Sequence, residues 1–274
     1  GKPGIDLAMA TPVSIEILKK NGLILPFDGE RIPNLRFIDP AFRHLPSDPS
    51  GRFFVPYAYG LNGILYNTGL VPEPITSWWT FWDERHAGKV TLLNDMMEVF
   101  WLGHHLLGYQ LEDRLPDQLD EAYALLKRQR PLLRKYESDL VNDMLLSQEV
   151  VMAQQWNGQA RRLTAEHPEF RFVVPQEGAS LFIDSLVLLK TAPHPDAAHR
   201  FIDFVLEPER SRQNMEAMLY PMPNPTACAL LPTAIRDDPT LFPPDLTRER
   251  FNILSDPGDF RRLIQNRWER LQAE

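Results

Sequence analysis

Apolar runs short enough for strands alternate along the chain with segments whose apolar residues recur at helical spacing. Strands are predicted at residues 6–10, 90–93, 149–156, 170–175 and 180–190, and helices at 12–22, 119–136, 157–168, 194–219 and 259–274. Residues 53–60 and 63–69 form two short extended segments, and residues 27–51, which lack periodicity, are expected to be surface connection. This alternation predicts an α/β fold with open sheets.

Proline residues interrupt or restrict several of these predicted elements. Pro131 should kink or break the helix over 119–136, and Pro208 should interrupt the helix over 194–219. Pro56 marks 53–60 as an edge or crossover strand, because proline donates no ladder hydrogen bond. Residues 77–84, which are rich in tryptophan, are expected to form a short helix.

Composition and charge narrow the functional class. The chain has 274 residues, enough for two lobes of ordinary domain size, and a net charge of −8. An acidic field disfavours nucleic acid and anionic membranes as partners. The single cysteine, Cys228, cannot form a disulfide within the chain, and no run of 18 apolar residues predicts a membrane span. The nucleotide-binding, nucleophile-elbow and metal motifs GxGxxG, P-loop, GxSxG, CxxC and HExxH are missing.

Two acids follow the predicted strand in "VTLLNDMMEVF" (residues 90–100). In a capping box, the Asp95 side chain accepts a hydrogen bond from the backbone N–H of Glu98, and the Glu98 side chain accepts one from the backbone N–H of Asp95. In a cation site, the same two acids share one face of the helix at the carboxyl end of a strand, where ligands of α/β folds collect. The local sequence favours the cap and leaves the cation site open.

Acids and aromatic residues recur at other predicted strand ends and loop openings. Asp184 lies inside the apolar strand "SLFIDSLVLLK", where an ionised acid needs a partner, and Phe182 is on the same face of that strand. Trp156 ends a strand, and Tyr220 opens the proline-rich loop "YPMPN". Carboxylates would bind the charges of an alkyl-ammonium ligand, and aromatic faces would cover its methylene groups.

A hydrolase is the alternative chemistry for these acids. Asp95, Glu98 and Asp184 could form a carboxylate pair for glycoside hydrolysis or a Mg²⁺ site. No nucleophile or metal motif supports that alternative, so no catalytic residue, metal ligand or cofactor is predicted.

Long segments of the chain resemble the spermidine/putrescine-binding proteins of bacterial ABC importers. The resemblance covers nearly the whole chain in the same order, and it rests on "VPYAYGLNGILYN", "SWWTFWDERHAGKVTLLNDMMEVF", "LLGY", "MAQQWNGQA", "VVPQEGASLFIDSLVLLKTAPHPDAAHRFIDFVLEPE" and "YPMPNP". It implies the two-lobed periplasmic-binding-protein fold of type II, with the ligand cleft between the lobes. Crossings between lobes are expected near Tyr59, Asp184 and Cys228, so that lobe 1 comprises 1–59 and 184–228, and lobe 2 comprises 60–183 and 229–274.

The resemblance also implies ligand-binding residues. Asp95 and Glu98 fall on the acids that bind one end of the polyamine, and Asp184 on the acid that binds another amine. Trp156 and Tyr220 fall on aromatic walls of the site.

Three further positions match the family less closely. Phe182 stands where the family often has tryptophan, so stacking is expected without an indole N–H. Asn252 lies near a family glutamine, and Thr11 lies near a serine of the first-lobe loop. Val13 replaces an expected tyrosine.

The start of the chain departs from the family. Family members begin with a strand, a loop with ligand contacts, a helix and a second strand before the segment that matches "GIDLAMA". We therefore expect an N-terminally incomplete first lobe, whose open sheet edge leads either to a homodimer through that lobe or to lower stability than that of a longer relative.

The function implied is capture of a polyamine by a periplasmic protein, or by an extracellular lipid-anchored one, for the permease subunits of an ABC importer. The protein is not expected to be an enzyme. The alternatives are capture of an amino acid, a thiamine-like cation or a metal complex, a carboxylate-using hydrolase, and a remnant that binds nothing.

Overall fold

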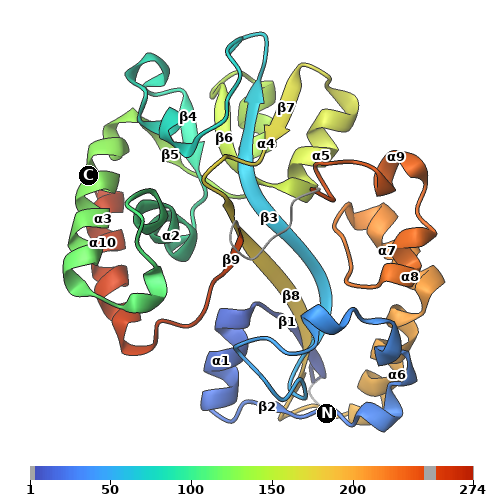
Figure 1. Ribbon diagram of the computed structural model, residues 1–274. Coiled ribbons are helices and arrows are strands. Elements are labelled where there is room, and N and C mark those ends of the chain that lie inside the picture. Colours follow the sequence, from blue (N-terminus) through green and yellow to red (C-terminus); the bar gives the residue numbers. More distant parts are fainter. Residues whose placement is uncertain (1–3, 244–250, 274) are drawn as a thin grey trace. The chain divides into compact units, whose positions relative to one another are not determined.

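The computed structural model describes residues 4–243 and 251–273 and divides into two units (Figure 1). Unit 1 consists of residues 4–60, 181–243 and 253–256, and unit 2 of residues 61–180, 251–252 and 257–273. Strands β3 (Val55–Asn67) and β8 (Ala179–Leu189) carry the chain from one unit to the other. These two passages fall between Gly60 and Leu61 and between Ser180 and Leu181.

In unit 1, β8 is the strand on which the others assemble. Strand β1 (Leu7–Ala10) pairs antiparallel with it, from Leu7 opposite Leu188 to Ala10 opposite Ser185, and β2 (Ile24–Leu25) pairs with its end. Between β1 and β2, helix α1 (Pro12–Lys20) begins after Thr11, whose side chain accepts a hydrogen bond from the Ser14 N–H. The helix ends before Gly22, whose positive φ of 62° favours glycine.

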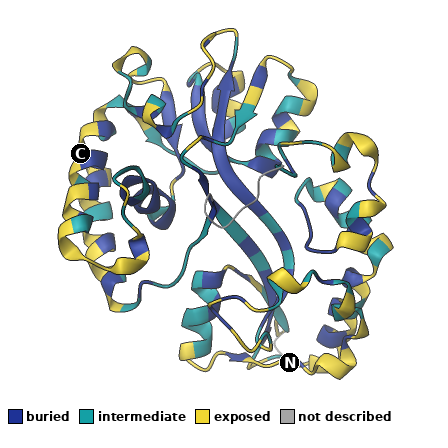
Figure 2. Ribbon diagram, in the orientation of Figure 1, coloured by how far each residue is buried: buried dark blue, intermediate teal, exposed yellow. Residues whose placement is uncertain are grey.

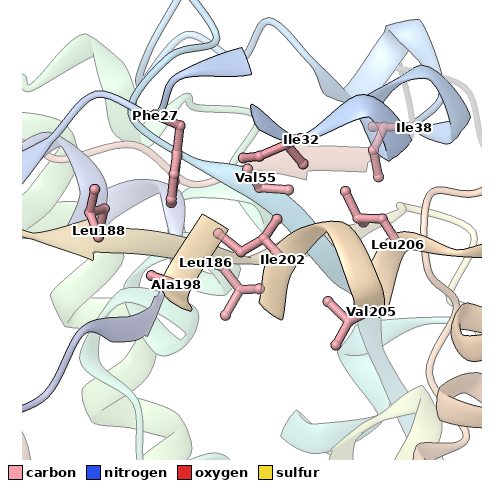
Figure 3. Packing of buried hydrophobic residues seen from close by; sticks show 10 residues of the cluster. All are labelled: Phe27, Ile32, Ile38, Val55, Leu186, Leu188, Ala198, Ile202, Val205 and Leu206. Carbon is pink, nitrogen blue, oxygen red and sulfur yellow. The ribbon is translucent and has the colours of Figure 1, made fainter. Parts of the chain in front are cut away.

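The segment expected to be surface connection contributes to the core of unit 1. Residues 29–42 form three short 3₁₀ helices, and Phe27, Ile32 and Ile38 are buried with Val55 against β8 and helix α6 (Pro195–Leu206) (Figure 3). The prediction of surface connection was wrong, because apolar residues spaced by single turns show no strand or helix period. They still bury side chains when a sheet and a helix lie beside them.

The third expected crossing, near Cys228, lies inside unit 1. Helices α7 (Pro208–Met218), α8 (Pro225–Ala229) and α9 (Thr233–Arg236) share one apolar cluster that contains Met215, Met222 and Leu231. Cys228 packs against this cluster, with its Sγ 3.9 Å from the Met215 Sδ. Because this packing holds residues 229–243 in unit 1, the chain first reaches unit 2 again after them.

Unit 2 is a mixed sheet covered by helices. Its strands β4 (Val90–Leu92) and β5 (Leu133–Tyr136) are parallel, as are β4 and β6 (Met152–Trp156), whereas β6 and β7 (Phe170–Val173) pair antiparallel with β3. The helices are α2 (Met96–Leu106), α3 (Pro116–Gln129), α4 (Val141–Leu146), α5 (Asn157–Glu166) and α10 (Arg261–Ala273). Helix α2 is buried on most sides, and α3 and α10 pack against it with their outer faces exposed (Figure 2). Strand β9 (Phe251–Ile253) is short and ends at the boundary between units.

Two elements differ from the sequence prediction. The helix predicted over 119–136 stops at Gln129, so the break at Pro131 is confirmed, but residues 133–136 form β5 instead of helix. The two extended segments predicted at 53–60 and 63–69 are one continuous strand, β3. The short helix predicted at 77–84 is observed as a 3₁₀ helix at residues 78–82, in which Trp78 and Phe81 are buried.

Gly63 allows the close pairing of β3 with β7. A Cβ atom at this position would lie 2.6 Å from the Val173 carbonyl oxygen and would overlap the Phe172 ring. The strand therefore needs glycine here, one residue from the buried Asn62.

Asp48 is a buried acid with a complete set of partners. Its carboxylate accepts hydrogen bonds from two side chains, Lys19 Nζ at 2.7 Å and Ser50 Oγ at 2.6 Å. It also accepts hydrogen bonds from two backbone N–H groups, those of Arg52 at 2.9 Å and Phe53 at 2.8 Å. Burial raises the pKa of Asp48, but the hydrogen bonds from Lys19, Ser50 and Phe53 outweigh burial and bring the pKa below its ordinary value.

We predict that Asp48→Asn lowers the free energy of unfolding by about 2 kcal/mol at pH 7, the range for hydrogen bonds to a charged group. Because the folded-state pKa is lowered, the stabilisation exists above the unfolded value near 3.8 and is lost as pH falls through the folded value. Urea denaturation at several pH values measures it. Asp196→Asn, which removes an exposed acid that pairs with Arg31, is the control and should change the free energy of unfolding much less. Equal effects of the two variants would contradict the assignment.

Candidate ligand-binding site

The joint between β4 and α2 carries the two acids that the sequence singled out. Asp95 caps α2, because its Oδ1 accepts hydrogen bonds from the N–H groups of Met97 at 2.8 Å and Glu98 at 3.1 Å. The predicted cap is confirmed for Asp95. Its side chain remains partly exposed at the helix N-terminus.

Glu98 does not complete the predicted capping box. Its Oε2 instead accepts from Asn62 Nδ2 at 2.6 Å and from Ser180 Oγ at 2.5 Å. The reciprocal half of the box was wrong, because two donors on neighbouring strands hold the carboxyl group away from the Asp95 N–H. Glu98 is 7% exposed.

Burial without a counter-ion changes the ionisation of Glu98. Burial raises the pKa of its carboxyl group to about 8, and the negative charge of Asp95 adds to the rise. Hydrogen bonds from Ser180 and Asn62 act in the opposite direction but do not cancel it. No lysine or arginine among the described residues pairs with Glu98, so the carboxyl group lacks a cation.

Asn62, which donates to Glu98, lies opposite the predicted aromatic ligand residue Trp156. Strands β3 and β6 pair so that Asn62 lies opposite Trp156, the last residue of β6. Trp156 is half-buried and immediately precedes α5, and Asn157 accepts a hydrogen bond from the Leu61 N–H at 3.2 Å. The asparagine that donates to Glu98 is therefore the cross-strand partner of Trp156.

Unit 1 contains a second group of acid and aromatic residues. The rings of Phe182 and Tyr220 meet edge to face, with centroids 5.7 Å apart. Phe182 and Asp184 are half-buried residues on the same face of β8, whereas Ile183 between them faces the core. Burial raises the pKa of Asp184, and no residue of 4–243 or 251–273 donates a hydrogen bond to its carboxyl group. Asp184 is thus a second acid without a cation.

The other two predicted positions have partners of their own. Thr11 is exposed and caps α1. Asn252 lies in β9 and donates from Nδ2 to Gln110 Oε1 at 3.3 Å. Their roles in ligand binding stay predictions, as do those of the six residues above. Over the described parts of the chain, no three histidine, cysteine or acidic side chains lie close enough to hold a metal ion.

Sequence reasoning missed Asn62 and Ser180. Both are buried polar residues, at 0% and 2% exposure, and a buried polar side chain in an apolar strand indicates a hydrogen-bonding partner. "LNGILYN" contains that signal at Asn62, but only the pairing of strands identifies Glu98 as the partner.

Comparison with known proteins identifies the family. A family model described as "bacterial extracellular solute-binding protein" matches residues 1–243. The chain belongs to this family. It is accordingly an extracytoplasmic protein of the solute-binding class. None of the helices in the described ranges is both long and apolar enough to cross a membrane.

Curated relatives are similar over almost the whole chain. The spermidine/putrescine-binding periplasmic protein of Escherichia coli is 29% identical over 98% of this chain and 77% of its own length. The putrescine/agmatine-binding protein of Pseudomonas aeruginosa is 25% identical over 100% of this chain and 80% of its own length.

Solved structures show the same fold. A putative spermidine/putrescine ABC transporter structure from Listeria monocytogenes has a TM-score of 0.92 at 27% identity, covering 99% of this chain and 85% of that one. The spermidine/putrescine transporter substrate-binding protein PotD from Streptococcus pneumoniae has a TM-score of 0.86 at 28% identity, with coverage of 99% and 85%. The predicted α/β periplasmic-binding-protein fold of type II is confirmed.

Asp95 combines a helix cap with an electric charge, and two substitutions separate these roles. Asp95→Asn keeps a good cap and should leave the free energy of unfolding nearly unchanged, whereas Asp95→Ala should lower it by about 1 kcal/mol. Both remove the charge that raises the pKa of Glu98, so that pKa should fall below about 8 in each variant. Urea denaturation and carbon NMR of the Glu98 carboxyl group measure the two effects. An unchanged Glu98 pKa in both variants would contradict the electrostatic coupling.

Proposed function

We propose that the protein captures a polyamine of the putrescine or spermidine class and delivers it to the permease subunits of an ABC importer. The carboxyl groups of Glu98 and Asp184 would each bind an ammonium group. Trp156, Phe182 and Tyr220 would cover the methylene chain, with Asp95, Asn252 and Thr11 as further ligand contacts. No chemical step on the ligand is proposed.

The observation that carries this proposal is the pair of acids that lack a cation. Burying an acid without a positive partner is unfavourable, and the raised pKa values of Glu98 and Asp184 express that cost. Each ammonium group of a diammonium ligand would supply the missing charge to one such acid. Hydrocarbon between its charges suits aromatic rings, which also attract cations.

The same observation favours a polyamine over an amino acid. The carboxylate of an amino-acid ligand is most often bound by arginine or lysine. Neither Glu98 nor Asp184 has such a residue as partner among the parts of the chain described. The relatives named above and a further one from Pseudomonas aeruginosa bind, by their names, spermidine, putrescine, agmatine or cadaverine, which supports the same ligand class.

The oligomeric state is a separate question. Strand β1 lies at one end of the strand order, and Met9 on it is 50% exposed. An edge of this kind can pair with another chain. The homodimer expected through the first lobe stays a prediction.

For Asp184, we predict that substitution by asparagine weakens putrescine binding by about 2–5 kcal/mol, the range for truncating one partner of a desolvated charge pair. Folding should change little because the two side chains are nearly equal in size. Titration calorimetry measures the affinity. Asp237→Asn, which alters an exposed acid of the same unit, is the control. Equal affinity of Asp184→Asn and the parent protein would exclude Asp184 from the site.

For Trp156, replacement by alanine should cost about 1–3 kcal/mol of putrescine binding, from lost methylene burial at about 0.8 kcal/mol per group and lost cation–π attraction. The chain has six tryptophans, so fluorescence is compared between the parent and Trp156→Phe. Trp79→Ala, at a tryptophan that is 44% exposed, is the control. If putrescine saturates the parent while the Trp156 component of emission stays constant, the indole is outside the site.

A further inference from the structure

The two oxygens of the Glu98 carboxyl group have different surroundings. Oε2 accepts both hydrogen bonds, from Asn62 Nδ2 and Ser180 Oγ. Oε1 accepts none from any residue that the structure describes. One oxygen is therefore fixed to the protein, and the other is left for a proton or a ligand.

Asn62 and Ser180 also hold each other. The Ser180 N–H donates to Asn62 Oδ1 at 3.2 Å, which turns the amide of Asn62 so that its Nδ2 faces Glu98. Three hydrogen bonds thus join three buried residues from β3, α2 and β8. A closed network of this kind fixes the position of each member.

We propose that Asn62 and Ser180 are positioning residues that make Glu98 a proton-exchanging anchor for an ammonium group. The inference rests on the proposed function. In the ligand-free protein the proton is on Oε1 in most molecules at neutral pH. When a diamine binds, the Oε1–H bond breaks, the proton leaves to solvent, and the carboxylate keeps the electron pair and accepts a hydrogen bond from the ligand ammonium group.

The surroundings of Glu98 support this exchange. The two neutral hydrogen-bond donors on Oε2 favour the charged form of Glu98. Burial and the charge of Asp95 favour its protonated form. Together these effects raise the pKa of Glu98 to about 8. Helices α3 and α10 pack against α2, but no charged group on them acts on Glu98; Asp95 is the one charge that does so among the described residues. Removing one of the two donors should therefore raise the pKa of Glu98 further and favour its protonated form.

The experiment uses titration calorimetry of putrescine in buffers of different ionisation enthalpy, from pH 6 to 10. The parent protein should release about one proton per putrescine at pH 7, since Glu98 is then mostly protonated. Ser180→Ala should bind about 10-fold to 100-fold more weakly at pH 7, the range for a lost hydrogen bond to a charged group. The putrescine affinity of Ser180→Ala should level off at a pH about one unit or more above that at which the parent's affinity levels off.

Two serine variants separate positioning from packing. Ser180→Thr keeps the hydroxyl group and should restore most of the affinity and the parent pH profile. Ser185→Ala is the matched control, because Ser185 is a buried serine of the same strand whose hydroxyl has no partner among the described residues. Ser185→Ala should leave the putrescine affinity and its pH profile unchanged. If Ser180→Ala does not fold, Asn62→Thr, which loses the amide group, is measured instead and should change both quantities in the same direction.

Failure of this inference is distinct from failure of the proposed function. If the parent binds putrescine without releasing a proton, or if Ser180→Ala keeps the parent pH profile, the inference is overturned and the function stands. If the parent takes up no putrescine, the proposed function is wrong. Carbon NMR of the Glu98 carboxyl group in the ligand-free protein then decides the inference, because Ser180→Ala must raise the titration midpoint and an equal midpoint would overturn it.

Discussion

A carboxyl group buried without a cation is the constraint on which the site depends. The chain buries acids in two ways. Asp48 has Lys19 and three further donors, and its pKa is lowered. Glu98 has only neutral donors, and its pKa is raised to about 8. The first arrangement stabilises the fold by itself, whereas the second leaves a demand for positive charge that a ligand can meet.

The fold provides the means to hold Glu98 in this state. Strand β3 carries Asn62, and β8 carries Ser180, each close to a point where the chain passes between units. Asp95 begins α2 at the end of β4, so Glu98 is on the first turn of a buried helix. Gly63, next to Asn62 in β3, leaves room for the Phe172 ring and the Val173 carbonyl group of β7. Three separate parts of the sequence therefore determine the environment of one carboxyl group.

The sequence predicted the elements with strong local signals. The cap at Asp95, the break at Pro208 and the strand that contains Asp184 follow from residue chemistry within a few positions, and each is observed. Residues 27–51 were misread because their buried side chains follow no regular period. The β5 strand was hidden by its continuity with a helical pattern, since Pro131 can either kink or end a helix.

The candidate site was predictable only in part. Acids and aromatic residues at strand ends identified Asp95, Trp156 and Asp184 as candidates. The partners of Glu98 could not be predicted, because Asn62 and Ser180 are far from it in sequence and meet it only through the pairing of strands. Register sets such contacts, and no short stretch of sequence specifies it.

The role of Glu98 as a buried acid that awaits a cation is tested most directly by the pH dependence of the free energy of unfolding, with and without putrescine, compared between the parent and Glu98→Gln. The folded-state pKa of Glu98 is raised from 4.5 to about 8, so its stabilising contribution is fully present below the lower value and is lost as pH rises to the higher one. We expect the parent to lose more free energy of unfolding than Glu98→Gln between these pH values, and saturating putrescine to abolish the difference. Parallel stability curves for the two proteins, or a difference that putrescine leaves untouched, would contradict it.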